Sequence, residues 1–237
     1  MRNAFFIWKR EVLAYLQTPT AYAAMAVFLV IGGYFFSVFL INTQQADMRP
    51  FFGNMGLIML FISPVLTMRL LAEETSQGTD ELLFTQPITY TQAVLGKYLA
   101  AVTVFLIMLL ISGVYPIILE YYGNPEWGVV MTGYLGFLLL GSTFLAVGLF
   151  TSSLTDSQMV AGIIGFAVLL LLWVVSWAAD TIGGTVGSIL RVMAVTEYYQ
   201  DFRRGIIDTR NVLFYLSFIV GFLFLTGRMV EKRTWGS

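Results

Sequence analysis

The sequence contains no cysteine and no histidine, and only 11% of its 237 residues are charged. The absence of cysteine excludes disulfides and thiolate chemistry, and the absence of histidine as well removes the usual zinc and haem ligand sets. We therefore expect no metal site. The charged fraction is under half of the roughly 25% typical of soluble domains. The net charge of −1 gives no reason to expect a nucleic-acid partner.

Hydrophobic residues are abundant instead: they make up 58% of the chain, and the mean hydropathy is +0.80. Six uncharged apolar runs approach the roughly 20 residues that cross a bilayer as a helix. We predict an all-α integral membrane protein with six transmembrane helices, in a single domain over residues 1–237. The first run lacks a small-residue cleavage site and is expected to remain as a span. The runs cover residues 21–41, 51–68, 98–119, 129–154, 159–179 and 212–227.

Basic residues indicate the orientation, because cytoplasmic loops carry an excess of lysine and arginine. They cluster before the first run, around the polar residues 69–97, and after the last run. An even number of spans puts both termini on one side, so we predict a multi-pass protein of a prokaryotic inner (plasma) membrane with both termini cytoplasmic. Residues 180–211 carry four arginines on the predicted outside. A five-span alternative would move them inward, but it would leave the basic C-terminus outside.

A polar insert, residues 69–91, separates the second and third runs and carries four acids within nine positions. Thr79 is placed to cap a short helix whose first turn carries acids, which the positive end of the helix dipole favours. Three apolar residues follow together, so the insert is predicted to form a short amphipathic helix. Pro87 ends that turn, and Thr89 with Gln92 predicts a capping box at the start of the next long helix.

The first 19 residues predict an amphipathic helix that lies in the plane of the membrane interface. Its basic residues, Arg2, Lys9 and Arg10, are expected to point to water. Membrane anchoring is the simplest role for such a helix. The apolar and aromatic residues expected on one face are Phe5, Trp8, Val12, Tyr15 and Leu16.

Residues 180–211 are too apolar for an ordinary loop and are predicted to form short external helices in the interface. Their acids alternate with arginines, which suits ion pairing at the level of the lipid head groups. Two interpretations stay open: an outer gate or partner contact, and a connector that only joins the last two spans. The residues assigned to the gate or partner contact are Tyr198, Tyr199, Phe202, Arg203 and Arg204.

Few polar groups lie within the predicted spans. They are available either to a transport path or to helix packing. The glycine pairs 133/136 and 162/165 are expected to allow close helix approach. Pro64 and Pro116 are expected to kink their helices, since a proline inside a helix removes one backbone hydrogen bond. The candidate path residues are Asn54, Ser63, Thr67 and Ser176.

The polar insert resembles the cytoplasmic coupling segment of type-two ABC transporter permeases. The resemblance extends to the opening residues 7–20, which look like the interfacial helix before the first span, and to residues 201–212 near the end. Within that family the chain looks nearest to the small permeases related to the gliding-motility ABC system. The residues that carry the likeness are Glu73-Glu74, Gly78-Thr79-x-Glu81-Leu82-Leu83, Pro87 and Leu95-Gly96-Lys97.

The resemblance implies a non-catalytic permease that binds no cofactor and turns ATP hydrolysis by a separate subunit into export or mechanical signalling. In agreement, Gly96-Lys97 has Thr91 where a phosphate-binding loop needs its first glycine. ATP and Mg would lie on a cytoplasmic ABC ATPase, present in two copies. A second permease copy or a similar chain, membrane lipid and an extracytoplasmic auxiliary subunit complete the expected partners. The ATPase-coupling residues would be Glu73, Glu74, Gly78, Thr79, Asp80, Glu81, Leu82, Leu83 and Phe84.

Two other classes of protein remain as alternatives. An ion-gradient-driven secondary transporter usually places ionisable residues at the midplane of the membrane, near broken helices. Here every acid maps to a loop or to the end of a span. A membrane anchor that recruits cytoplasmic proteins would tolerate a rebuilt insert that still binds, whereas a permease would lose ATP-driven activity.

Overall fold

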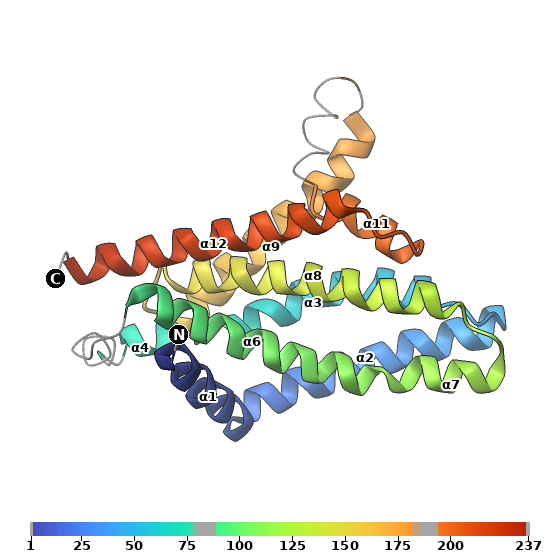
Figure 1. The fold of residues 1–237 in the computed structure, drawn as a ribbon, viewed down its shortest axis with the longest axis horizontal. Helices are drawn as coiled ribbons and strands as arrows, with labels where there is room; N and C mark the ends of the chain where they lie inside the picture. Colours follow the sequence, from blue (N-terminus) through green and yellow to red (C-terminus); the bar gives the residue numbers. More distant parts are fainter. Residues whose placement is uncertain (1, 77, 79–88, 183, 185–193, 236–237) are drawn as a thin grey trace.

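The computed structural model describes residues 2–76, 78, 89–182, 184 and 194–235, and every regular element within these residues is a helix. The long helices run roughly side by side along the bundle (Figure 1). The helices are α1 (Arg2–Gln17), α2 (Pro19–Thr43), α3 (Arg49–Thr67), α4 (Ala72–Ser76), α6 (Tyr90–Ser112), α7 (Val114–Tyr122), α8 (Trp127–Ser152), α9 (Gln158–Ile182), α11 (Glu197–Arg203) and α12 (Thr209–Trp235).

Six stretches of the described chain are long and apolar enough to cross a membrane, which confirms the predicted six-span, all-helical architecture. α2, α8, α9 and α12 each form one such stretch, while α3 with α4 and α6 with α7 form the other two. Most of the helices extend beyond the predicted runs. The largest extensions are at the start of α6, at Tyr90 rather than near residue 98, and at the end of α12, at Trp235 rather than near residue 227.

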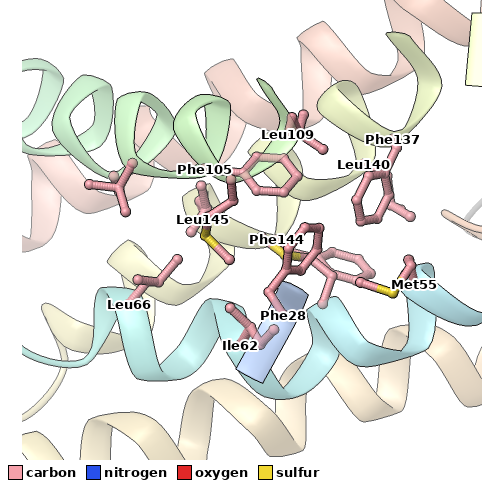
Figure 2. Packing of buried hydrophobic residues seen from close by; sticks show 14 of the residues in the cluster. Phe28, Met55, Ile62, Leu66, Phe105, Leu109, Phe137, Leu140, Phe144 and Leu145 are labelled. Carbon is pink, nitrogen blue, oxygen red and sulfur yellow. The ribbon is translucent and has the colours of Figure 1, made fainter. Parts of the chain in front are cut away.

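Two helices form the centre of the bundle. In α3 and α8 the most apolar windows are 67% and 78% buried, against at most 39% in the other spans. α3 packs against α2, α8 and α9, and α8 also packs against α6, α11 and α12. Large side chains from α2, α3, α6 and α8 fill the space between them (Figure 2). The fully buried residues there include Phe28, Met55, Phe105, Phe137 and Phe144.

Glycines let the central helices approach closely, as predicted. A Cβ atom at Gly133 would clash with the ring of Phe52 on α3, and one at Gly136 would clash with Phe202 on α11. In α9, a Cβ atom at Gly165 would lie 2.9 Å from the hydroxyl of Thr151 on α8. Real Cβ atoms rarely approach other atoms so closely, because interiors are already packed to crystal density.

The break between α6 and α7 confirms the predicted kink at Pro116. α6 ends at Ser112, Gly113 separates the helices, and Pro116 lies in the first turn of α7. Proline has no N–H to donate to the carbonyl four residues earlier, which is that of Ser112. The hydroxyl of Tyr134 on α8 donates to this carbonyl at 2.9 Å instead. Pro64 lies inside α3, which ends within one turn of it at Thr67.

Both termini and α4 lie at the same end of the bundle (Figure 1). At this end the C-terminal helix is tied to the loop after α8, because Arg233 pairs with Asp156 at 2.8 Å. The α2–α3 and α7–α8 connections lie at the opposite end (Figure 1). We call the end with the termini the inner end and the other the outer end.

Candidate functional site

The chain leaves the second span through a short turn at residues 68–71, between the end of α3 and the start of α4. The N–H of Leu70 donates to the carbonyl of Thr67, three residues back, at 3.0 Å. The carbonyl of Leu66, which Leu70 would serve in a continuing helix, therefore needs another donor. The turn is buried, and buried backbone groups without partners are costly. Side chains from three other helices meet this need.

Tyr15 and Lys97 supply donors to two of these carbonyls. The hydroxyl of Tyr15 on α1 donates to the carbonyl of Leu66 at 2.5 Å, and the ammonium group of Lys97 on α6 donates to that of Leu70 at 2.6 Å. The guanidinium of Arg69 lies over the ring of Tyr15, 4.8 Å from its centroid. The side chains of Tyr15 and Lys97 thus attach α1 and α6 to backbone carbonyls at the turn and not to its side chains.

Ser152, at the end of α8, contacts the same turn from a third direction. Its hydroxyl donates to the carbonyl of Met68 at 3.0 Å. It also accepts from the N–H groups of Leu71 and Ala72, at 3.2 and 3.1 Å, which are among the first free donors of α4. One hydroxyl therefore hydrogen-bonds to backbone groups both at the end of α3 and at the start of α4.

Four charged side chains form a compact cluster beside the turn. Lys97 lies 2.8 Å from Glu74 of α4 and 3.5 Å from Glu11 of α1. Arg10 reaches the same two carboxylates at 2.8 and 2.7 Å. The Lys97 side chain is only 1% exposed, so its charge depends on these partners, whereas that of Arg10 is 53% exposed. The two acids and two bases balance, as buried charges must.

The electrostatics of Glu11 reflect this arrangement. Burial alone acts to raise the pKa of its carboxyl, but the charge of Lys97 and the hydrogen bond from Arg10 outweigh burial and lower the pKa below its ordinary value. Burial opposes the charge of Arg10 in the same way, and hydrogen bonds and charge attraction from Glu11 and Glu74 leave its pKa raised. Both groups are therefore held in their charged forms.

α1 packs on the bundle with much of the predicted apolar face. Tyr15 is buried, and Trp8 and Val12 pack against the core, whereas Phe5 is 57% exposed. Ile7, which was not assigned to that face, is also buried and packs closely on Gly96 of α6, where an added Cβ would lie 2.8 Å from it. The indole of Trp8 donates to Thr103 at 2.9 Å. α1 is therefore part of the helical bundle.

The predicted coupling residues fall into three groups. Glu74 pairs within the chain, while Glu73 is half-buried with no ion pair among the described residues. Gly78 has a φ of +64°, a conformation that favours glycine. Just after these residues, Thr89 caps α6, and its N–H donates to the side chain of Gln92 at 3.4 Å, which confirms the capping box. Thr79, Asp80, Glu81, Leu82, Leu83 and Phe84 lie outside the described residues.

At the outer end, α11 lies against α3 and α8. Tyr199 donates to the carbonyl of Phe52 at 3.1 Å, and Phe202 is fully buried against α8. Nε of Arg203 donates to the carbonyl of Arg49 at 3.2 Å. Tyr199 and Arg203 thus attach α11 to the start of the second span, and Phe202 attaches it to α8.

The other two residues predicted at the outer end lie elsewhere. Tyr198 stacks on Phe214 of α12 at 4.0 Å between ring centroids, and Arg204 is exposed. Asp201 accepts a hydrogen bond from Asn211 at 2.9 Å, which joins α11 to the start of α12. The described part of the segment thus contains a short helix, α11, as predicted for residues 180–211.

A family model described as ABC-2 family transporter protein matches residues 12–233, nearly the whole chain. The chain belongs to the ABC-2 transporter family. A comparison with curated proteins gives no match. ABC-2 permeases are transmembrane subunits, and they generally work with a cytoplasmic ABC ATPase. The resemblance noted from the polar insert is thus confirmed for the family.

The candidate path residues of this ABC-2 permease differ in their surroundings. Asn54 is exposed, whereas Ser63 and Thr67 are buried, and Thr67 donates to the Ser63 carbonyl at 2.8 Å. A Cβ at Gly148 would clash with Thr67, so this side chain serves packing between α3 and α8. Ser176 lines a pocket at the outer end.

Five residues of the inner site were not predicted as site residues: Arg10, Glu11, Tyr15, Lys97 and Ser152. Lys97 was placed at the edge of the third span, just before the uncharged run at residues 98–119. In the structure it lies within α6 and is buried. The available signal was a lysine on the first turns of an apolar helix, with acids in two separate polar segments to pair with it.

Proposed function

We propose that the chain is the transmembrane subunit of an ABC transporter that converts ATP binding and hydrolysis by a separate cytoplasmic ATPase into export or mechanical signalling. The observation that carries the proposal is the 68–71 turn, because Tyr15, Lys97 and Ser152 attach it to three helices at once. The turn opens the predicted coupling segment, residues 69–91, which also contains α4. A force applied there would reach most of the bundle.

The contacts favour movement of rigid bodies. Lys97 pairs with Glu74, so α4, which lies within the coupling segment, is joined to α6, which begins at its end. α1 moves with them, because Glu11 and Tyr15 belong to the same set of contacts. Closure of the ATPase on ATP would then tilt α3 and α6 together, as in other rigid-body transitions.

The wider assembly follows from the family. We propose two permease copies, or this chain with a similar one, with two ATPase subunits that hold ATP and Mg. The inner end faces the cytoplasm, since eight of the thirteen basic residues lie there, and the membrane is the inner membrane of a prokaryote. The gliding-motility-type subgroup and an extracytoplasmic auxiliary subunit belong to the same proposal.

The test is gentle detergent purification from the native host, followed by mass measurement of the intact complex. We expect a cytoplasmic ATPase in equal stoichiometry, two with two. Glu73→Lys should weaken this association, because it reverses an acid on α4 that has no ion pair in the described part of the chain. Glu120→Lys, an exposed acid at the outer end, is the matched control. Recovery of the chain alone would oppose the proposal.

A further inference from the structure

A pocket of about 190 Å³ opens at the outer end, between α3, α9 and α11. It is smaller than the roughly 300–1,000 Å³ of sites that enclose a drug-sized ligand. Its lining combines two indoles, Trp173 and Trp177, with the charged side chains of Glu197 and Arg203. A pocket of this size and chemistry fits a charged head group, and the rest of a larger ligand has to lie outside it.

Arg203 is held in this pocket by a specific feature of α3. Its guanidinium packs on Gly53, where an added Cβ would lie 2.7 Å from one terminal nitrogen. Nε is used by the carbonyl of Arg49, and no carboxylate pairs with Arg203 among the described side chains. The terminal nitrogens are therefore available to a planar anion such as a carboxylate or a phosphate.

Glu197 places an opposite charge in the same pocket. It lies six residues before Arg203 in α11, which is about 9 Å along a helix axis. Glu197 has no ion pair within the part of the chain that the structure describes. A carboxylate beside two indoles is the chemistry that binds ammonium groups, through charge and cation–π contacts. The lining thus offers one position for an anion and another for a cation.

The pocket lies beside an exposed apolar surface of α9. Trp177 lines the pocket and is 72% exposed. Val174 and Leu171, one and two turns earlier, are 43% and 65% exposed. Tryptophan is enriched at the level of lipid head groups, and the apolar face below it suits acyl chains.

We propose that this pocket binds the head group of a zwitterionic phospholipid in the outer leaflet. The phosphate would accept hydrogen bonds from Arg203, and the ammonium group would lie between Glu197 and the indoles. The acyl chains would follow α9. This inference does not depend on the ATPase, so it can fail while the proposed function holds.

The test measures the lipid retained by the purified, intact complex after exchange into mixtures of phosphatidylethanolamine and phosphatidylglycerol. We expect preferential retention of phosphatidylethanolamine, reduced about tenfold by Arg203→Gln, since a charge-assisted bidentate contact is lost. Arg204→Gln removes the same charge from an exposed neighbour outside the pocket and should leave retention unchanged. Glu197→Gln should shift the preference toward phosphatidylglycerol, an effect that simple destabilisation would not produce.

Trp177→Ala is a second variant that should fold normally, because the side chain is largely exposed. It should also reduce retention of phosphatidylethanolamine. Equal retention of both lipids by the unmodified protein would overturn the inference, as would equal losses in Arg203→Gln and Arg204→Gln. Soluble phosphoethanolamine is the last competitor. If it displaces the bound lipid as effectively as phosphatidylethanolamine does, the pocket binds a free solute, and the lipid assignment is overturned.

Discussion

The ammonium group of Lys97 lies 2.8 Å from the carboxylate of Glu74, although residues 77–89 separate the two helices that carry them. This pair closes the base of the coupling segment. The two ends of the segment are therefore joined to each other. The chain just before α4 is also bonded to α1 through Tyr15 and to α8 through Ser152. Displacement of the segment is therefore expected to move several helices, not one.

Lys97→Met tests this base. The substitution keeps the approximate length of the side chain but leaves Glu11 and Glu74 without their buried base and the Leu70 carbonyl without its donor. Breaking a buried ion pair from one side costs about 3 kcal/mol. We expect a clear fall in the midpoint of thermal unfolding in detergent, together with loss of transporter activity.

Lys232→Met is the control for Lys97→Met, because Lys232 is exposed near the C-terminus. It removes the same charge at the same end of the molecule and should change the unfolding midpoint little. Equal stability of the two variants would show that the cluster contributes nothing beyond a solvated ion pair.

Acid should weaken the cluster through Glu11. Its pKa is lowered from an ordinary value of 4.5, so its contribution to stability is complete above that value and is lost as the pH falls through the folded-state pKa. Glu11→Gln should be less stable than the unmodified protein near neutral pH and should lose less stability between about pH 6 and about pH 3. Thermal unfolding across this range measures both; parallel pH profiles would refute the prediction.

Tyr134→Phe tests the break between α6 and α7. The hydroxyl donates to the Ser112 carbonyl, which Pro116 leaves without its helical partner. Its removal should cost about 1–2 kcal/mol, because a buried acceptor is left unsatisfied. In a Pro116→Ala background the new N–H can serve this carbonyl, so the same change should cost less. A double-mutant cycle without coupling between the two positions would contradict this.

Gly136→Ala should destabilise the bundle strongly, because the added methyl group would overlap Phe202 of α11 and force the external helix away. Gly221→Ala on α12 meets nothing within 4 Å and should be neutral or slightly stabilising. Comparison of the two unfolding midpoints separates the effect of packing from that of helix propensity. Similar midpoints would mean that α11 does not pack on α8 as described.

The fold was predictable from the sequence because the spans are long, apolar and uncharged. Glycine pairs and Pro116 also gave correct local predictions, since their effects depend on backbone chemistry alone. The capping box at Thr89 and Gln92 also predicted the start of α6, well before its apolar run. The end of α12 was less predictable, because the helix continues to Trp235, beyond the apolar run that ends at residue 227.

The inner site was harder to predict because its contacts join residues far apart in the sequence. Nothing local shows that Tyr15 bonds to the carbonyl of Leu66, or that Ser152 bonds to the turn at residues 68–71. The amphipathic pattern of α1 suggested a membrane-facing aromatic surface. The structure instead buries Tyr15 of that surface, which bonds to α3, and also Ile7, which packs on α6, while Phe5 stays exposed.

Contact between α4 and a cytoplasmic ATPase is tested most directly by cross-linking in native membranes. The chain has no cysteine, so Ser76→Cys introduces a single thiol at the exposed end of α4. Thr43→Cys, exposed at the outer end, is the matched control. With a short thiol-to-amine cross-linker, we predict that Ser76→Cys alone captures an ATP-hydrolysing subunit. Capture of no such subunit by Ser76→Cys, or equal capture by both variants, would contradict coupling through α4.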